Sequence, residues 1–251
     1  MEAIGRERMI AILSPAKNMK QAVSPAGMTV PRFEARALAL QNLLSTLSPW
    51  EIESMMRVSP KLAMRAFGLI QSFDRAQGEA AAFSYDGLAY RSLNAASLDE
   101  RALGSLQGRV RILSALYGVL RPLDAIRPYR LEMHSRVRVY GQSLYAYWGA
   151  DIAWALYEET RSVVNLASEE YASAVRPYVP ADARFIDVEF RVLRKGRLCI
   201  PPTYAKMARG RMARYIAEHA IDEPDGLRAF EEDGWRLDPV RSSGDRLVFS
   251  R

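Results

Sequence analysis

The sequence predicts one α+β domain of irregular, mixed α/β character over residues 9–251. Segments with strand and helix patterns follow one another in no fixed order, without an internal repeat or a linker. A chain of 251 residues lies within the range of a single large domain and can bury a substantial core. Residues 1–8 carry charges but no hydrophobic periodicity, so we expect them to form an extension outside this domain.

The first predicted elements are a buried strand and a helix. Residues 9–13 form a short apolar run that ends at Ser14-Pro15, as expected for a buried strand that enters a loop. This loop carries Lys17. Apolar residues at helical spacing then predict a helix over residues 31–46.

A pair of helices follows. Ser48 is a favourable N-cap, with Pro49 at the first helical position and Glu51 at the third, and this helix runs to about residue 57. A tight break at residues 58–61 precedes a third helix that ends near Phe73. The pair is either an ordinary part of the core or a helix-hairpin-helix, whose short turn can offer backbone N–H groups to phosphate.

The middle of the chain mixes turns with short regular segments. Asp86-Gly87 marks a turn within residues 83–93. Residues 110–113 predict a strand, and residues 114–120 a helical turn. A helix is predicted over residues 144–159, whose aromatic side chains we assign mostly to the core.

The last third predicts a strand, a helix and two hairpins. The strand at residues 163–168 ends in polar side chains, a common position for a functional site. The helix at residues 203–220 contains Gly210, which costs about 1 kcal/mol relative to alanine and therefore indicates a close approach to the backbone. The hairpins pair residues 184–193 with 197–200, through a turn at Lys195-Gly196, and residues 235–237 with 246–249.

The composition excludes several classes of protein. The single cysteine, Cys199, cannot form a disulfide within the chain, and its apolar neighbours predict a buried, inert thiol. Two histidines are too few for a histidine-based metal site, and we expect neither a resident metal nor a cofactor. No apolar run approaches the roughly 20 residues of a membrane span, so we expect a cytoplasmic protein without membrane association.

The charge is basic and unevenly distributed. The formal net charge is +6 and the isoelectric point about 9.5. Residues 190–217 contain eight Lys or Arg and no acidic residue, and residues 109–138 contain seven Arg against Asp124 and Glu132. Such segregation favours a partner that carries phosphate.

The segment 113–133 is the strongest candidate for a functional site. It sets three arginines among apolar residues, and Pro122 and Pro128 restrict the backbone between them. With basic and polar residues from other elements, these arginines predict an anion-binding cleft that would clamp phosphate or carboxylate. We assign to it Lys17, Arg121, Arg127, Arg130, Asn165, Ser168, Lys206 and Arg209, and we assign Glu132 and Glu170 as candidate catalytic acid–base groups.

The residues alone leave several hypotheses open. The chain is either a nucleic-acid-binding protein that recognises structure rather than sequence, or an enzyme acting on a small anionic or nucleoside-like substrate. A purely structural alternative is a network of ion pairs that only stabilises the fold. A weaker alternative is iron binding through Asp124, Glu132 and Glu170.

Several segments together resemble the YaaA family of bacterial peroxide-stress proteins, also called DUF328 or UPF0246. The long run Leu-Tyr-Gly-Val-Leu-Arg-Pro-Leu-Asp at residues 116–124 is the most specific of them. The others are Ile12–Lys17, Val164–Ser168 with Glu170-Tyr171, Tyr204–Lys206 with Ala208–Gly210, and Ser242–Phe249. The resemblance extends over nearly the whole chain from Met9, and departs from some members at residues 85–90.

The resemblance implies a compact mixed α/β domain with a positively charged cleft, in a cytoplasmic protein that limits oxidative damage by lowering available iron or protecting DNA. It also implies binding to double-stranded DNA, including distorted duplexes, through a helix-hairpin-helix. That element maps onto the predicted pair of helices, with Arg57, Ser59, Lys61 and Arg65 as its DNA-binding residues. The resemblance implies no particular reaction.

Overall fold

The computed structural model describes residues 8–194 and 196–251 and shows one mixed α/β domain. The expected extension, except for Arg8, and Lys195 of the expected turn lie outside the described residues. Ten α-helices and twelve strands are assigned within the described ranges. None of these helices is both long enough and apolar enough to cross a membrane.

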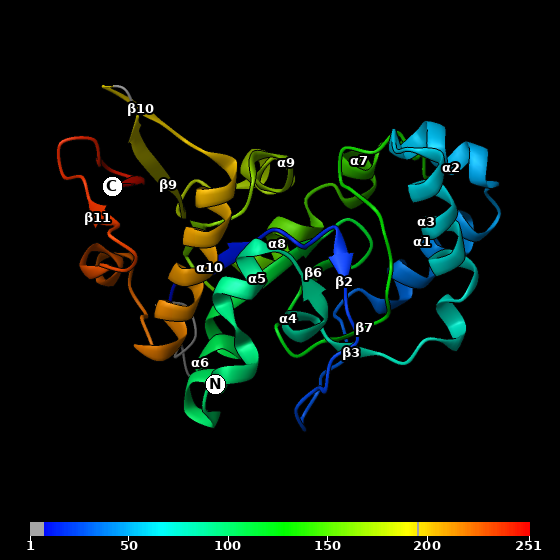
Figure 1. Cartoon of the computed structure of the whole chain (residues 1–251), viewed down its shortest axis with the longest axis horizontal. Helices are drawn as coiled ribbons and strands as arrows, with labels where there is room; N and C mark the ends of the chain where they lie inside the picture. The colour runs from blue at the N-terminus through cyan, green and yellow to red at the C-terminus, as the bar shows by residue number, and fades with distance from the viewer. Residues whose placement is uncertain (1–7, 195) are drawn as a thin grey trace.

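A central eight-stranded sheet organises the molecule (Figure 1). Its order is β11-β12-β9-β8-β1-β5-β6, and β10 pairs with β9. The strands are β1 (Ile10–Leu13), β5 (Val110–Ser114), β6 (Gly118–Leu120), β8 (Ser162–Asn165), β9 (Arg184–Arg194), β10 (Arg197–Cys199), β11 (Arg236–Leu237) and β12 (Arg246–Ser250).

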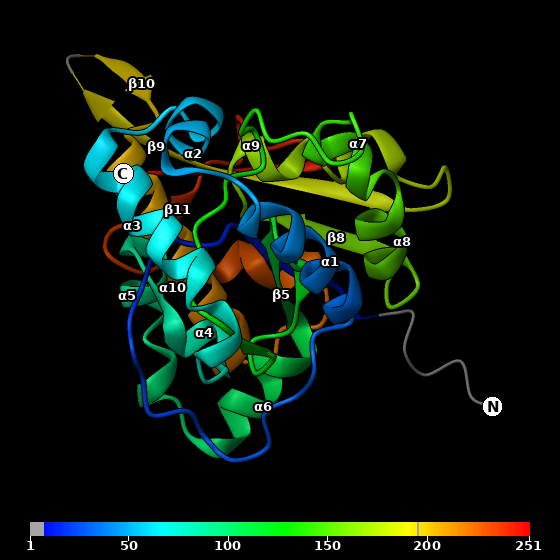
Figure 2. The same cartoon turned by 90° about the vertical axis from the view of Figure 1, so that its right-hand side faces the viewer.

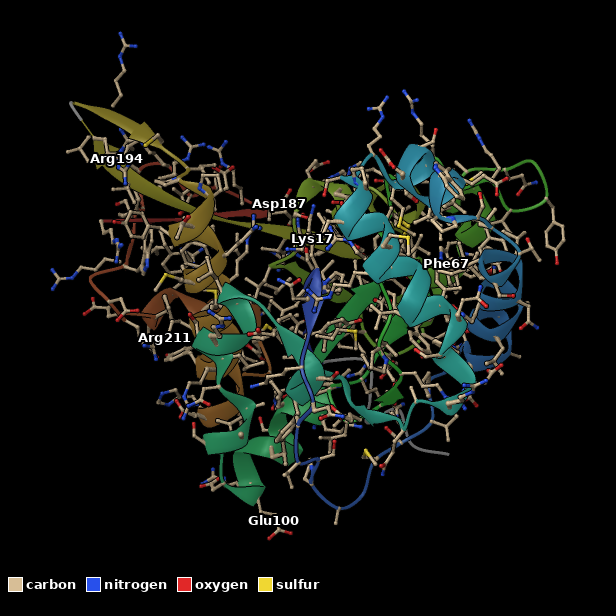
Figure 3. All side chains as sticks on the ribbon, turned by 45° about the vertical axis from the view of Figure 1, so that its right-hand side comes forward. Lys17, Phe67, Glu100, Asp187, Arg194 and Arg211 are labelled. Atoms are coloured by element: carbon tan, nitrogen blue, oxygen red, sulfur yellow. The ribbon has the colours of Figure 1, made fainter. Side chains whose placement is uncertain are left out.

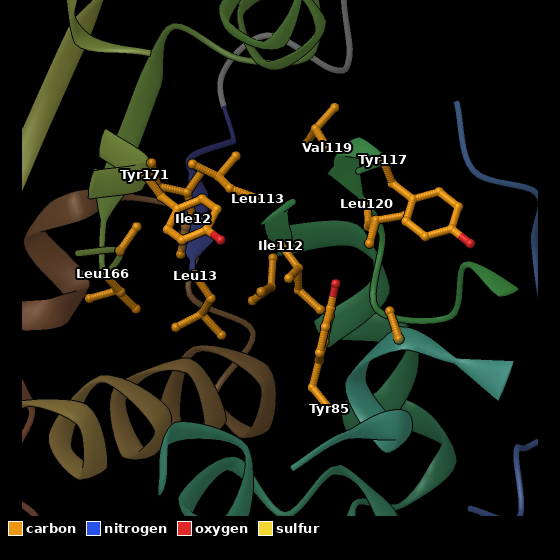
Figure 4. Close-up of a cluster of buried hydrophobic side chains, with 14 of the residues drawn as sticks. Ile12, Leu13, Tyr85, Ile112, Leu113, Tyr117, Val119, Leu120, Leu166 and Tyr171 are labelled. Carbon is orange, nitrogen blue, oxygen red and sulfur yellow. The ribbon is translucent and has the colours of Figure 1, made fainter. Parts of the chain in front are cut away.

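The five inner strands, β12, β9, β8, β1 and β5, are parallel, and β6, β10 and β11 are antiparallel additions. The register pairs Ala11 with both Val110 and Val164. Every residue of β1 is buried, because helices and loops cover both faces of the sheet there. Figure 4 shows this region of the core, where Ile12 and Leu13 meet Ile112 and Leu113.

The helices form two main groups (Figures 1 and 2). In one group α10 (Pro202–Glu218) packs against α5 (Leu88–Leu93) and α6 (Glu100–Arg109). In the other, α3 (Pro60–Gln71) packs against α1 (Glu34–Ser45) and α2 (Pro49–Met56). The shorter helices are α4 (Ala81–Ser84), α7 (Leu144–Trp148), α8 (Asp151–Tyr157) and α9 (Glu169–Ala172).

Two short ribbons connect these groups to the loops around the sheet. One pairs β2 (Asn18–Met19) with β4 (Tyr85–Asp86), and the other pairs β3 (Glu79–Ala80) with β7 (Ala125–Ile126). The first ribbon fixes the loop after β1 beside the start of α5. It therefore brings the Lys17 loop close to the surface of α10.

Several local predictions are confirmed, with their expected cause. Ser48 and Glu51 form a capping box at the start of α2, in which the Glu51 N–H donates to Ser48 Oγ at 3.3 Å. Gly210 lies where α10 meets α5, and a Cβ built there would lie 1.9 Å from the Ala89 carbonyl oxygen. The close approach indicated by Gly210 is therefore made by the protein's own backbone.

Three local predictions are wrong. Residues 114–120 form a turn into β6, because Ser114 Oγ accepts the Leu116 and Tyr117 N–H groups and Gly118 has a φ of +72°. The helix predicted over residues 144–159 is two helices, interrupted at Gly149 with a φ of +50°. Cys199 is exposed, because β10 is attached only to the outer end of β9.

Candidate functional site

A pocket of about 420 Å³ lies at the carboxyl edge of the parallel strands. It is lined by the loop after β1, the start of α5, the segment before and including Glu132, the residues after β8, and one face of α10. The polar and charged residues in this lining are Ser14, Lys17, Asn18, Asp86, Arg130, Glu132, Ser168, Glu170, Lys206 and Arg209.

The sheet topology explains this position. The chain leaves β1 for β5 on one side, whereas it leaves β8 for β9 on the other side, so a crevice opens between neighbouring strands β1 and β8. Ligands of open α/β sheets bind at such switch points. Here Ser14, just after β1, accepts the Ser168 N–H at 2.8 Å and donates to Ser168 Oγ at 3.1 Å, which ties the two loops together.

Glu132 lies among the cations of the pocket. It accepts a hydrogen bond from Lys17 Nζ at 2.8 Å and another from Arg130 Nη2 at 3.1 Å. The side chains of Glu132 and Arg130 are only 13% and 11% exposed, whereas that of Lys17 is 60% exposed. Glu132 and Arg130 therefore form a fixed pair, and Lys17 reaches it from the solvent side.

His134 joins the two acidic residues that were predicted as catalytic. Its Nδ1 lies 2.7 Å from Glu170 Oε1, and its Nε2 lies 3.9 Å from Glu132 Oε2. Ligand atoms of the three side chains lie within 4.8 Å of one another, and two carboxylates with one imidazole suit a divalent transition metal. In this structure Lys17 already donates to the same Glu132 oxygen that faces His134. Asp124 does not join them, since Thr29 Oγ1 and the Arg121 N–H donate to it elsewhere.

Lys206 and Arg209 bring positive charge to the pocket from α10. No hydrogen bond or ion pair to either side chain occurs within residues 8–194 and 196–251, and Arg209 Nε is buried without a partner. Burial lowers the pKa of the Arg209 guanidinium below its ordinary value, because water is removed and no anion replaces it.

Buried tyrosines form the apolar part of the wall. Tyr129 Oη lies 2.7 Å from both Tyr85 Oη and Ser114 Oγ, and Tyr90 donates to the Ser14 carbonyl at 2.8 Å. Burial raises the pKa of Tyr129 to about 12, so its phenol stays neutral at physiological pH. These tyrosines therefore shape the pocket through their rings.

The pocket gathers seven of the ten residues predicted for the cleft: Lys17, Arg130, Glu132, Ser168, Glu170, Lys206 and Arg209. The other three lie outside its lining. Arg121 is exposed. Arg127 lies over the Phe73 ring and 3.6 Å from Asp74, while Asn165 donates to Asp187 at 2.7 Å and accepts the Ala167 N–H at 2.9 Å.

Some lining residues were not predicted from the sequence. Ser14 directly follows a strand end, and this position was sufficient to suggest it. His134 stands two residues after Glu132, but its meeting with Glu170 depends on tertiary structure. Tyr90 and Asp86 come from the segment where the sequence departs from some members of the resembling family, and no local pattern distinguishes them.

The four residues predicted to bind DNA lie on the turn between α2 and α3. Arg57 is the C-cap that follows α2, with a φ of 51°, and Ser59 is the N-cap of α3, in which Pro60 is the first residue. Arg57, Ser59, Lys61 and Arg65 are all exposed, and the side chains of the three cations form no ion pair with any described residue. We call these four residues the hairpin cluster. A second, small hollow of about 40 Å³ is lined by Arg65 and Leu69 of α3 and by Lys17 and Arg130, which also line the pocket. Figure 3 shows Lys17 beside the helix that carries Phe67.

Comparison with known proteins yields a family and several close relatives. The profile of the family described as peroxide stress protein YaaA matches residues 9–241. The chain is 40% identical over 259 residues to a UPF0246 protein of Cupriavidus pinatubonensis, which covers 97% of this chain and 98% of that protein. It is 38% identical over 241 residues to a UPF0246 protein of Lacticaseibacillus paracasei, covering 95% and 98%. A UPF0246 protein of Burkholderia mallei is 40% identical over 257 residues, covering 97% and 98%.

Proposed function

We propose, from the premise that this chain belongs to the peroxide stress protein YaaA family, that it protects the cell from peroxide by binding duplex DNA. In this proposal the hairpin cluster contacts the phosphate backbone in the cytoplasm and recognises DNA structure rather than sequence. Binding limits iron-dependent oxidative damage to the DNA.

The observation that supports this proposal is the state of the cations in the hairpin cluster. Arg57, Lys61 and Arg65 are exposed and form no ion pair among the described residues. Many other arginines of the fold form ion pairs with carboxylates, such as Arg184 with Asp245 at 2.8 Å. Unpaired surface cations can exchange their counterions for phosphates, which is the main source of non-specific DNA affinity.

The backbone of the turn supports the same role. Helix α3 has twelve residues, and the side chain of its N-cap, Ser59, makes no hydrogen bond to the N–H groups of the first turn. The N–H groups at the start of this helix are therefore available to an anion, and the helix dipole favours a phosphate there. Contacts of this kind position a duplex without reading its bases, so we expect similar affinity for unrelated sequences.

Fluorescence anisotropy with a labelled duplex tests this proposal across a range of salt concentrations. We expect the logarithm of the affinity to fall linearly with the logarithm of salt, by about 0.9 for each phosphate contact. Arg57→Glu with Lys61→Glu should weaken binding at least tenfold and reduce the slope by about 2. Glu132→Gln is the matched control and should leave both values unchanged. Equal affinity and slope in the hairpin double variant and the unaltered protein would contradict the proposal.

A second candidate function is an enzyme that acts on a phosphorylated or nucleoside-like small anion. The pocket at the switch point favours it, because three carboxylates and several cations line one cavity. In this role Glu132 or Glu170 serves as general acid or base. Glu170→Gln should then abolish turnover of a substrate while its binding persists, and turnover at the unaltered rate would exclude Glu170 as an acid–base group.

A further inference from the structure

The Arg209 side chain is charged, largely buried and without a described partner. Its Nε is inaccessible to solvent and makes no hydrogen bond, and burial is the cause of its lowered pKa. A buried charge that lacks a partner costs several kcal/mol of folding free energy. The fold therefore tolerates an unfavourable group at this point of the pocket wall.

Other buried arginines of this protein have partners. Arg109 donates to both oxygens of Asp222, at 3.1 and 3.0 Å, and also to Ser105. Arg111 pairs with Glu159, and Arg130 pairs with Glu132. Arg109 and Arg111 lie outside the pocket lining, and Arg130 lines the pocket but is paired with Glu132. Arg209 faces the pocket without a carboxylate partner, so a ligand can supply the missing anion there.

The surroundings of Arg209 define where an anion can lie. Lys206, one turn earlier on α10, lines the same pocket and likewise forms no ion pair with a described residue. The carboxylates of the pocket are paired with other residues: Glu132 accepts from Lys17 and Arg130, Glu170 from His134, and Asp86 from Arg91. The α10 side of the pocket is therefore the cationic side.

The pocket also offers a hydrogen-bond acceptor. Glu170 Oε2 takes part in no hydrogen bond or ion pair with the part of the chain that the structure describes. Leu13, Leu131 and the tyrosine rings supply apolar wall to the same pocket. A volume of about 420 Å³ lies within the range of roughly 300–1,000 Å³ typical of small-ligand pockets.

We propose that this pocket binds a small organic oxyanion of about nucleotide size, whose charged group pairs with Arg209 and Lys206 and whose hydroxyl or amino groups donate to the carboxylates of the same pocket. A guanidinium can bind two oxygens of a phosphate or carboxylate at once, so the single side chain of Arg209 is sufficient to fix the orientation of such a group. None of the four residues of the hairpin cluster lines this pocket, so the proposed ligand site goes beyond DNA binding. It shares the pocket of the second candidate function but requires only binding.

Thermal unfolding with added oxyanions tests the proposal. The probes are inorganic phosphate, ribose 5-phosphate, adenosine monophosphate and citrate, with adenosine as the uncharged comparison. At a hundredfold excess over its dissociation constant, a binding probe should raise the melting temperature by about 5–10 °C. Phosphate esters and citrate distinguish a preference for phosphate from one for carboxylate.

The decisive variant is Arg209→Met. Without a probe, it should melt at the same temperature as the unaltered protein or above it, because the substitution removes a buried unpaired charge. It should lose at least about tenfold in affinity for the probe, and with it the rise in melting temperature. Arg211→Met is the matched control: it lies on the same helix, contacts Asp233 at 3.3 Å and is absent from the pocket lining, so it should keep the rise.

Three results would overturn the proposal. They are no rise with any oxyanion in the unaltered protein, an undiminished rise in Arg209→Met, or a large fall in the melting temperature of Arg209→Met without a probe. Arg209→Lys retains the charge and should retain part of the probe-induced rise in melting temperature. This variant keeps the proposal testable if Arg209→Met fails to fold. Release of phosphate from a bound ester is measured separately. Binding without release of phosphate would contradict the enzyme function but not the binding proposal. Loss of DNA binding in the hairpin double variant is independent of all these results.

Discussion

The pocket and the hairpin cluster are both rich in cations, but the cations are held in different ways. In the pocket, Arg130 and Lys17 are bonded to Glu132, and the segments that carry them are fixed by the sheet and the β2–β4 ribbon. In the hairpin cluster, the cations extend into solvent and no described carboxylate pairs with them. Figure 3 shows Lys17 between the α10 side, labelled at Arg211, and the α3 side, labelled at Phe67.

This difference indicates two kinds of recognition. Fixed and partly paired charges favour one ligand geometry, because their positions do not adjust and their unsatisfied atoms must be matched. Exposed, flexible cations favour a repeating array of phosphates, for which the position of each contact matters little. The comparison therefore supports both proposals, a small ligand for the pocket and DNA for the hairpin cluster.

The largest expected effect concerns the helices that carry the two regions. Gly210→Ala would place Cβ against the backbone of Ala89, so we expect a loss of about 3 kcal/mol in unfolding free energy. Gly68→Ala in α3 is the matched control, since nothing lies within 4 Å of its Cβ position; it should gain about 0.5–1 kcal/mol. Urea unfolding measures both. A Gly210→Ala protein of unaltered stability would show that α10 and α5 do not fix the pocket as closely as described.

The second effect concerns the paired charges. Glu132→Gln removes the negative charge and one of the two oxygens that accept from Lys17 and Arg130, and we expect it to lower the unfolding free energy by about 2 kcal/mol because Arg130 stays buried. Lys61→Gln on the hairpin should change it by less than about 0.5 kcal/mol. Equal losses in the two variants, measured by urea unfolding, would erase the distinction between paired and unpaired cations.

The third effect tests whether Asn165 is structural rather than part of the pocket. Asp187 accepts hydrogen bonds from Asn165 at 2.7 Å and from Arg176 at 2.8 Å. Burial alone would raise the pKa of Asp187, but these bonds outweigh it and lower the pKa below its ordinary value. A carboxyl with a lowered pKa in the folded state stabilises the fold above its unfolded-state pKa of about 3.9, and this stabilisation disappears as the pH falls through the folded-state pKa.

Asp187→Asn should therefore lower stability at neutral pH by about 1 kcal/mol, a modest value because the site is partly exposed. Between pH 5 and 2 its stability should fall less than that of the unaltered protein, as measured by unfolding at several pH values. An identical pH profile in both proteins would mean that Asp187 does not hold Asn165 in the way described. Oxyanion binding in the pocket should be unaffected.

Local signals predicted those parts of the fold that local chemistry determines. The capping box at Ser48 and Glu51 and the hairpin of β11 and β12 are determined by residues close in sequence. Gly210 signals a close contact through its residue type alone, although the partner, Ala89, is distant in sequence. The turn after Ser114 was mispredicted because its apolar residues match a helix as well as a strand. The antiparallel pairing with β5 and the packing of Gly118 on Trp148 decide between them, and both are tertiary contacts.

The same limit applies to the candidate site. The polar ends of β1 and β8 suggested Lys17, Ser168 and Glu170, because strand ends converge in a parallel sheet. Arg127 has the same local pattern as Arg130, yet its side chain contacts Phe73 and Asp74 and does not line the pocket. Residue types and spacing identify which charges are available, whereas packing decides which of them share a cavity.

The most direct test of the central claim measures both kinds of binding on both variants. Anisotropy with duplex DNA and the melting shift with an oxyanion probe are recorded for Arg57→Glu/Lys61→Glu and for Arg209→Met. We expect the hairpin double variant to lose DNA affinity and keep the melting shift, and Arg209→Met to keep DNA affinity and lose the shift. Loss of both kinds of binding in both variants would contradict the claim and show that the two regions form a single binding surface.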